Sequence, residues 1–273
     1  MVWAMLPGPA HAPDEPRPDR PDGDETFGFR AVSAEEKPGL VRAVFDSVAP
    51  SYDLMNDLMS GGLHRLWKAD LARRMDPKPG MHLVDVAGGT GDVAFRFLDR
   101  AKEPAKDGAP AHATVVDTNP NMIEVGRARA IDRGRLSGLD WAVGDASALP
   151  LADGVADTYS IVFGIRNVTG REAALAEARR VLKPGGRFFC LEFGRLPAGP
   201  LGRLYDTYSF AVVPLVGQVV TGDGDAYRYL VESIRRFPEA GAFSGMVSEA
   251  GLDRVRVHRL SGGIVNLFTA WRL

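Results

Sequence analysis

From residue 82 onward, short apolar runs alternate with segments whose apolar residues recur at helical spacing. The runs predict strands at HLVDVAG, ATVVD, LDWAVG, ADTYSIVFG and RFFCLEF. The intervening segments predict helices over 91–100, 120–132 and 170–182, and the last of these ends at the turn formed by Lys183-Pro184-Gly185-Gly186. This βαβα order is typical of an α/β fold, in which helices cover both faces of a parallel sheet.

The end of the chain has a different pattern. A helix is predicted over 239–250, and the runs RVRVHRL and IVNLFTAWRL flank a Ser-Gly-Gly turn. Two strands around such a turn predict an antiparallel hairpin. The predicted fold is therefore a Rossmann-like seven-stranded sheet of the class I methyltransferase type, with an antiparallel last strand. A nicotinamide-binding Rossmann domain would instead end with another parallel strand.

The region before residue 82 is predicted to be helical over 34–75, with breaks at Pro50 and at Gly61-Gly62. Residues 1–26 contain many prolines and acidic residues, which predicts a disordered tail. The folded domain then spans 27–273. An aromatic-rich helical insertion interrupts it at about 200–236 and predicts a lid.

Composition limits the partners of the protein. The net charge of −2 provides no basic field for nucleic acid, and the five histidines show no metal-ligand spacing, so we expect no metal site. The single cysteine, Cys190, lies in an apolar run and is interpreted as a core residue.

The longest apolar run, 210–220, is interrupted by Pro214 and Gly217, so we expect no transmembrane helix. A tail without a basic presequence favours a bacterial cytoplasmic protein.

The glycine-rich segment VDVAGGTGD, residues 84–92, joins the first predicted strand to a helix. Glycine permits positive φ and close approach of a ligand, and the helix that begins near Gly91 offers unpaired N–H groups. These groups suit a pyrophosphate or the carboxylate of S-adenosylmethionine. Gly88 and Gly91 are therefore candidate cofactor contacts, and the alternative is a tight turn that binds no ligand.

Two acidic residues follow the next predicted strands. Asp117 ends TVVD, where a carboxylate can accept hydrogen bonds from both hydroxyls of a ribose, although DTNPNM also suggests that Asp117 caps a helix. Asp145, in GDASALPL, can accept a hydrogen bond from the amino group of an adenine, and Ala146 can supply a backbone N–H. Together, the three loops favour S-adenosylmethionine over a dinucleotide.

Several longer motifs carry a resemblance to a known family. They occur in order as FGFRAVSAEEK, YDLMNDLMSGGLHRLWK, DVAGGTGD, FGIRNVT, RVLKPGGRF, LEF, YDTYSF and YRYLVESIRRFP. Over residues 27–273 the chain resembles the ubiquinone/menaquinone biosynthesis C-methyltransferases, the UbiE family. DVAGGTGD and RVLKPGG alone would indicate only a class I methyltransferase, whereas YDLMNDLMS, FGIRNVT and YRYLVESI are more specific.

The resemblance implies methyl transfer from S-adenosylmethionine to a ring carbon of a polyprenyl benzoquinol or naphthoquinol. It implies cofactor contacts at Thr90, Asp117, Asp145 and Ala146. At a further contact position many members of the family have a serine, and this chain has Val162, so only a backbone contact is expected there.

FGIRN places Arg166 and Asn167 at the end of the fourth strand, beside the expected cofactor cleft. A ring carbon becomes a good nucleophile when the phenol ionises, which at neutral pH costs about 4 kcal/mol for a pKa near 10. A guanidinium would lower that cost, so Arg166 and Asn167 are predicted to be catalytic. Tyr52 is a candidate for orienting the ring. The alternatives are an Arg166 that pairs with a nearby carboxylate and a Tyr52 that only packs between helices.

The apolar insertion is expected to line a groove for the prenyl tail and to touch the inner-membrane surface, where such quinols reside. A buried helix pair or a dimer contact would give the same pattern, as would a place in a quinone-synthesis complex. Two other functions remain open, namely methylation of another lipid-soluble phenol and a non-catalytic scaffold in such a complex.

Overall fold

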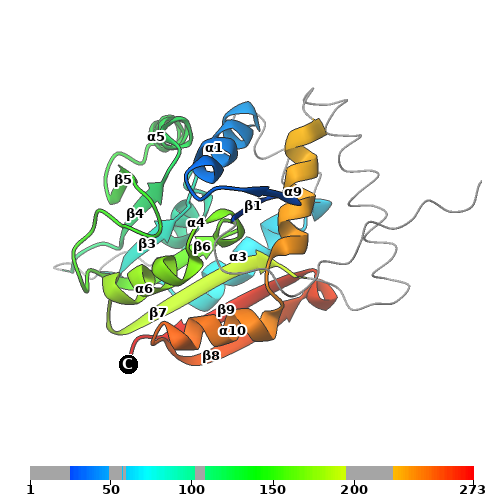
Figure 1. Ribbon diagram of the computed structural model, residues 1–273. Helices are drawn as coiled ribbons and strands as arrows, with labels where there is room; N and C mark the ends of the chain where they lie inside the picture. Colours follow the sequence, from blue (N-terminus) through cyan, green and yellow to red (C-terminus); the bar gives the residue numbers. More distant parts are fainter. Residues whose placement is uncertain (1–24, 49–56, 58–59, 102–107, 195–223) are drawn as a thin grey trace, which may run out of the picture.

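A seven-stranded sheet forms the centre of the protein (Figure 1). This computed structural model describes residues 25–48, 57, 60–101, 108–194 and 224–273. The strand order is β5-β4-β3-β6-β7-β9-β8, and only β9 runs antiparallel to its neighbours. The prediction of a methyltransferase-type sheet with an antiparallel last strand is confirmed.

The strands of this sheet lie where the apolar runs predict them. Their bounds are β3 His82–Val86, β4 His112–Asp117, β5 Leu139–Val143, β6 Ala156–Val162, β7 Leu182–Phe193, β8 Asp253–Leu260 and β9 Val265–Trp271. The predicted turn at 183–186 is wrong, because these four residues lie inside β7. Ala156 pairs with Leu182 and Thr158 pairs with Arg187, so a bulge absorbs the intervening residues.

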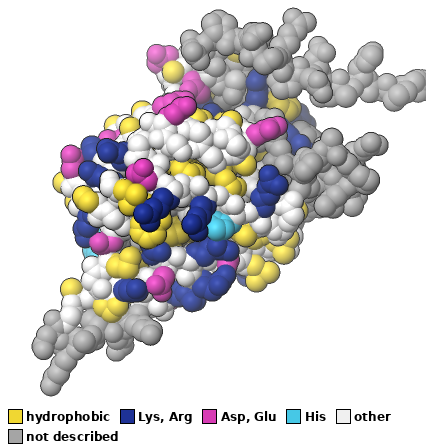
Figure 2. Space-filling view, turned by 90° about the horizontal axis from the view of Figure 1, so that it is seen from below, with side chains coloured by type: hydrophobic (Ala, Val, Ile, Leu, Met, Phe, Trp, Pro, Cys, Tyr) yellow, Lys and Arg dark blue, Asp and Glu magenta, His cyan; other side chains and the backbone are white. Residues whose placement is uncertain are grey.

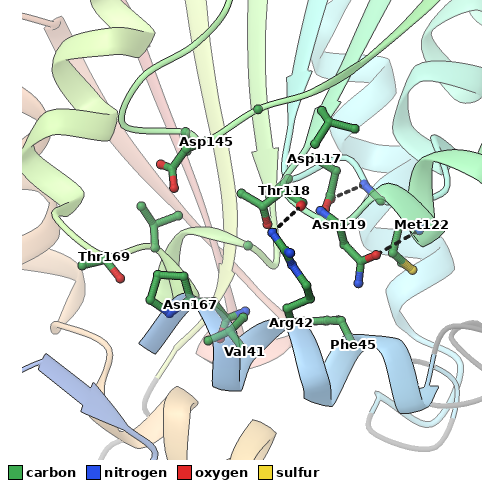
Figure 3. A pocket seen from close by; sticks show the side chains of 18 of the residues that line it. Val41, Arg42, Phe45, Asp117, Thr118, Asn119, Met122, Asp145, Asn167 and Thr169 are labelled. Atoms are coloured by element: carbon green, nitrogen blue, oxygen red, sulfur yellow. Dashed lines mark hydrogen bonds between the residues drawn. The ribbon is translucent and has the colours of Figure 1, made fainter. Parts of the chain in front are cut away.

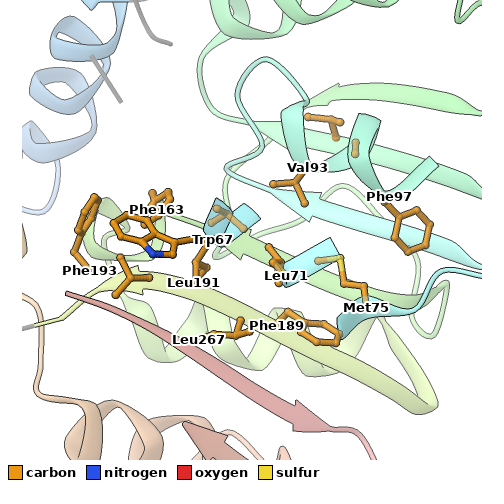
Figure 4. Packing of buried hydrophobic residues seen from close by; sticks show 14 of the residues in the cluster. Trp67, Leu71, Met75, Val93, Phe97, Phe163, Phe189, Leu191, Phe193 and Leu267 are labelled. Atoms are coloured by element: carbon orange, nitrogen blue, oxygen red, sulfur yellow. The ribbon is translucent and has the colours of Figure 1, made fainter. Parts of the chain in front are cut away.

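Helices cover both faces of the sheet and bury an apolar cluster on each. α3 His64–Met75, α4 Asp92–Arg100 and α5 Pro120–Asp132 cover one face, and α6 Arg171–Val181 and α10 Ala240–Glu249 cover the other. On the first face, Trp67 of α3 packs its ring against Phe163 and Phe193 at the ends of β6 and β7 (Figure 4). Cys190 is fully buried in the second cluster, as predicted, and burial raises the pKa of its thiol well above the ordinary value.

A third group of elements lies above the carboxyl ends of the strands. It consists of α1 Glu36–Val48, α9 Gly224–Arg236 and a hairpin of β1 Glu25–Phe27 with β2 Arg30–Val32 (Figure 1). The sequence pattern predicts neither hairpin strand, and β1 includes two residues assigned to the tail. The remainder of that tail, residues 1–24, and most of the predicted lid, residues 200–223, lie outside the described residues.

The edge strand β8 is strongly charged. Its residues Arg254, Arg256 and Arg259 are exposed, and Figure 2 shows basic side chains gathered on the underside of the protein. Charged side chains on an edge strand oppose pairing with the sheet of another molecule. Among the described helices, none combines the length and apolar character needed to cross a membrane.

Candidate active site

A cavity of about 290 Å³ lies at the carboxyl ends of β3, β4, β5 and β6. β4 and β5 lie on one side of β3, and β6 and β7 lie on the other, so the strand order switches direction between β3 and β6. Open α/β sheets bind ligands at such a switch point. α1 closes the cavity from the opposite side (Figure 3). The predicted site residues that line this cavity are Asp117, Asp145, Ala146 and Asn167.

The glycine-rich loop after β3 forms one wall. Gly89 and Gly91 have φ values of 55° and 79°, as the glycine pattern predicts, and Gly91 caps α4. Ala87 also has a positive φ of 49°, which is uncommon for a residue with a Cβ. A Cβ added to Gly164 would lie 2.5 Å from the Cβ of Ala87, so the loops after β3 and β6 touch only because residue 164 is glycine.

Asp117 connects this loop to the start of α5. Its carboxylate accepts hydrogen bonds from the N–H of Gly89 at 2.8 Å and from the N–H of Asn119 at 2.9 Å. The helix cap is Asn119, whose side chain accepts from the N–H groups of Asn121 and Met122, so Asp117 is not the N-cap. Burial raises the pKa of the Asp117 carboxyl, and the two N–H groups oppose that shift. Each carboxylate oxygen retains one lone pair for a ligand hydroxyl.

Asp145 lies on another wall of the same cavity (Figure 3). Its Oδ1 accepts from the backbone N–H and the hydroxyl of Ser147, at 2.7 and 2.6 Å. These bonds fix the carboxylate and leave Oδ2 available to accept a hydrogen bond from a ligand amino group. The neighbouring Ala146 is buried in the apolar cluster, where it backs this part of the cavity.

Two residues of α1 hold this helix across the cavity, and the sequence pattern does not reveal their contacts. Asp46 accepts hydrogen bonds from the side-chain amides of Asn119 and Asn121, at 2.8 and 2.9 Å. Arg42, which also lines the cavity, donates to the carbonyl of Thr118 at 3.4 Å (Figure 3). α1 is thereby fixed to the loop that carries Asp117.

Four predicted cofactor residues lie outside the lining of this cavity. They are Gly88, Thr90, Gly91 and Val162. All except Gly91 line a second cavity of about 20 Å³ beneath the glycine-rich loop. The hydroxyl of Thr90 accepts a hydrogen bond from Arg129 at 2.9 Å, and a Cβ on Gly91 would lie 2.6 Å from the ring of Trp141. Their roles as cofactor contacts stay predictions.

The small cavity also contains a buried acid that the sequence analysis does not single out. Asp85 accepts a hydrogen bond from Ser160 at 2.6 Å through Oδ1, while its Oδ2 has no partner among the described residues. Burial raises the pKa of Asp85 to about 7, opposed by the Ser160 hydrogen bond and the charge of Lys68. Lys68 itself forms an ion pair with Asp92 at 3.1 Å.

Arg166 and Asn167 lie in η2 Ile165–Asn167, but they face different surroundings. Asn167 lines the large cavity, and Arg166 is not among the described residues that do so. The Arg166 guanidinium is buried and bonds to the Glu192 carboxylate at 2.8 Å, to the Phe163 carbonyl at 2.6 Å and to the Ser233 hydroxyl at 3.2 Å. The pairing with a carboxylate that the sequence left as an alternative is therefore present, and direct catalysis by Arg166 stays a prediction.

One predicted site residue, Tyr52, and one histidine of α3, His64, remain to be considered. Tyr52 lies outside the described residues, so its predicted role stays a prediction. His64 is buried, and its Nε2 lies 2.8 Å from Asp57. Burial lowers the pKa of His64, and the hydrogen bond with Asp57 opposes that change.

The arrangement suits an adenosine-containing cofactor. The large cavity combines two fixed carboxylates, one half-buried beside the glycine-rich loop and one at the end of the neighbouring strand, with apolar walls from Val41, Phe45 and Met122. Acceptors for ribose hydroxyls and for an adenine amino group are thus present in one cavity. Asn167 adds an amide from a different strand end.

Comparison with known proteins identifies close relatives. The model of the ubiE/COQ5 methyltransferase family matches residues 30–272. A protein of Caulobacter vibrioides named ubiquinone/menaquinone biosynthesis C-methyltransferase UbiE is 54% identical over 250 residues, covering 91% of this chain and 98% of the relative. The mitochondrial 2-methoxy-6-polyprenyl-1,4-benzoquinol methylase of Danio rerio is 47% identical over 283 residues, covering 93% of this chain and 86% of that protein.

Solved structures agree in fold at lower sequence similarity. A SAM-dependent methyltransferase of Thermotoga maritima aligns with a TM-score of 0.57 at 20% identity, covering 85% of this chain and all of that one. At this identity the likeness shows the shared fold alone, that of Rossmann-like methyltransferases.

Proposed function

The chain belongs to the ubiE/COQ5 methyltransferase family, and we propose that it transfers a methyl group from S-adenosylmethionine to a ring carbon of a polyprenyl benzoquinol or demethylmenaquinol. The observation that carries the proposal is the large cavity, which is lined by the carboxylates of Asp117 and Asp145 and by the amide of Asn167. The carboxylates suit the nucleoside, and the amide suits the oxygen of an acceptor. The names and identities of the relatives support the substrate class.

S-adenosylmethionine, when bound, would supply a methyl group on a positively charged sulfur, so that the new bond to the ring carbon forms as the sulfur–methyl bond breaks and S-adenosylhomocysteine leaves. The methylated ring carbon then loses its proton to solvent, which restores the aromatic ring. In this proposal Asp117 accepts hydrogen bonds from the ribose hydroxyls, and Asp145 accepts one from the adenine amino group. The bonds from Gly89 and Ser147 hold the two carboxylates in place before the ligand arrives. Such preorganisation reduces the free-energy cost of ordering on binding.

The acceptor ring requires a negative charge on its oxygen to make the neighbouring carbon nucleophilic. Ionising a phenol of pKa near 10 at neutral pH costs about 4 kcal/mol. An N–H donor held where the charge develops lowers that cost, because it need not reorganise during the reaction. Asn167 lines the cavity and carries two such N–H bonds on its amide nitrogen.

Arg166 supports this turn from behind. Its guanidinium bonds to the carbonyl of Phe163 and to the carboxylate of Glu192 on β7, and so ties the segment that precedes Asn167 to the sheet. Phe163 has a φ of 57°, a conformation that a bulky residue adopts only when its surroundings hold it there. We therefore assign Arg166 the role of positioning Asn167, and its charge is offset locally by Glu192.

The prenyl tail completes the proposed substrate. Its predicted groove involves residues 200–223, which lie outside the described residues, so the apolar sequence of that segment is the support for this part. Contact with a membrane surface belongs to the same proposal, because prenylated quinols partition into lipid.

The test of the proposed function is transfer of labelled methyl from S-adenosylmethionine to a short-tailed, demethylated benzoquinol or naphthoquinol. Reduced and oxidised acceptors are compared, and the position of the label is determined. Label on a ring carbon with the reduced form only is the expected result. Tight cofactor binding without transfer to either acceptor would contradict the proposed substrate while leaving the cofactor assignment intact.

A further inference from the structure

Tyr229, on α9, contacts the side-chain amide of Asn167. Its side chain is buried, and its ring stacks on that of Phe27 from β1, with centroids 4.0 Å apart and an interplanar angle of 14°. The hairpin is held in turn by Glu25, which forms an ion pair with the buried Lys37 at 2.8 Å, and by the N–H of Phe29, which donates to Glu232 of α9 at 3.1 Å. Tyr229 therefore occupies a fixed position.

The hydroxyl of Tyr229 donates a hydrogen bond to Oδ1 of Asn167 at 2.9 Å. A side-chain amide has one acceptor end and one donor end, so fixing the oxygen also fixes the direction of the nitrogen. Asn167 lines the cavity, and with its oxygen held by Tyr229 the two N–H bonds are available on the remaining side.

The surrounding charges favour this direction of the hydrogen bond. Burial raises the pKa of Tyr229 to about 12, while the charges of Arg166 and Arg171 oppose that shift. The hydroxyl therefore keeps its proton at neutral pH. The two guanidinium groups attract the lone pairs of the phenolic oxygen, which leaves the hydrogen directed to Asn167.

We propose that Tyr229 is a positioning residue, which orients the amide of Asn167 so that its N–H groups bind the acceptor oxygen in its anionic form. This inference rests on the proposed function, because it assigns a phenol-type oxygen to the Asn167 side of the cavity. Tyr229 acts through Asn167 and does not itself contact the acceptor. No feature of the sequence pattern indicates it, because the two residues are 62 positions apart.

The first test is the variant Tyr229→Phe, which keeps the ring stacked on Phe27 and removes only the hydroxyl. We expect kcat to fall about tenfold or more, because a misdirected Asn167 amide loses its hydrogen bond to the negatively charged acceptor oxygen. The affinity for S-adenosylmethionine should be unchanged. Tyr227→Phe is the matched control, because Tyr227 is a buried tyrosine of the same helix, whereas the hydrogen bond to the Asn167 oxygen comes from Tyr229. Its kcat should stay within twofold of wild type.

The double variant Tyr229→Phe/Asn167→Ala separates positioning from independent effects. If Tyr229 acts through Asn167, the double variant is no slower than Asn167→Ala alone. Multiplicative losses in the double variant would overturn the inference, because they would show that Tyr229 contributes by another route.

A binding readout makes the inference independent of turnover. The probe is a 4-nitrophenol with a short alkyl chain, whose ionisation is followed by absorbance in the presence of S-adenosylhomocysteine. The wild-type protein should lower the apparent pKa of the probe relative to free solution, and Tyr229→Phe should reverse at least half of that shift. Equal values in both proteins, or no shift in wild type, would overturn the inference. Failure of methyl transfer by wild type with the probe shift intact would instead contradict only the proposed reaction.

Discussion

The Arg166 guanidinium and the Glu192 carboxylate form an ion pair at 2.8 Å in which both side chains are almost completely buried. Removing one partner from such a pair leaves an uncompensated charge in the interior, which costs about 3–5 kcal/mol. We therefore expect Glu192→Ala to lower the free energy of unfolding by that amount, measured by urea denaturation. Arg135→Ala, which breaks an exposed pair with Asp99, is the control and should cost about 1 kcal/mol or less.

A second prediction separates the geometry of Arg166 from its charge. Arg166→Lys keeps a positive charge but cannot bond simultaneously to Glu192, Phe163 and Ser233. If Arg166 positions the turn, the kcat of this variant should fall about as far as that of Arg166→Ala, at least tenfold, with little change in cofactor affinity. Near wild-type turnover in Arg166→Lys would show instead that the charge itself acts on the acceptor.

The assignment of Asp117 predicts a loss of cofactor affinity. Asp117→Ala removes the proposed ribose acceptors and the carboxylate that holds the N–H of Gly89. Hydrogen bonds to charged groups contribute about 1.5–3 kcal/mol each, so affinity for S-adenosylmethionine should fall at least tenfold in calorimetry. Unchanged affinity would exclude Asp117 from the ribose site. The control is Asp132→Asn, at an exposed position on the next helix, which should bind S-adenosylmethionine as wild type does.

Asp85 predicts a dependence of stability on pH. Its pKa of about 7 in the folded protein exceeds the ordinary value of 3.8, so the folded state binds the proton more tightly than the unfolded state. The contribution of this group to stability is therefore highest at low pH and falls as pH rises from about 4 through 7. At 1.36 kcal/mol per pH unit, wild type should lose about 2–3 kcal/mol between pH 5 and pH 8 relative to Asp85→Asn.

The comparison is made by urea unfolding of both proteins at the two pH values. Asp132→Asn, which changes an exposed aspartate, should show the same change in the free energy of unfolding between the two pH values as wild type. A wild-type slope equal to that of Asp85→Asn would mean that Asp85 titrates normally and that its environment is more polar than the structure indicates.

The sheet and the cofactor side of the site follow from local sequence. Apolar runs end at Asp117 and Asp145, and parallel strands bring such ends to one edge, so periodicity alone places both carboxylates together. The glycine-rich loop is also predictable, because positive φ at Gly89 and Gly91 matches what glycine permits.

The acceptor side could not be predicted in the same way. Arg166 and Asn167 are adjacent in sequence, yet one side chain enters the interior and the other lines the cavity, because a 3₁₀ turn separates their directions. Their partners, Glu192 and Tyr229, are brought close only by the tertiary fold. One signal was present: an acid inside the apolar run RFFCLEF must find a cationic partner when buried.

The place of β9 in the sheet also constrains how the protein is made. β9 is the last strand along the chain, yet it pairs with β7 on one side and β8 on the other. During synthesis, the edge of β7 that carries Cys190 stays unpaired until residue 271 has left the ribosome, because its partner residue, Phe268, belongs to β9. A growing chain thus presents an apolar edge with unsatisfied backbone N–H and C=O groups for the whole time in which the 78 residues from 194 to 271 are translated.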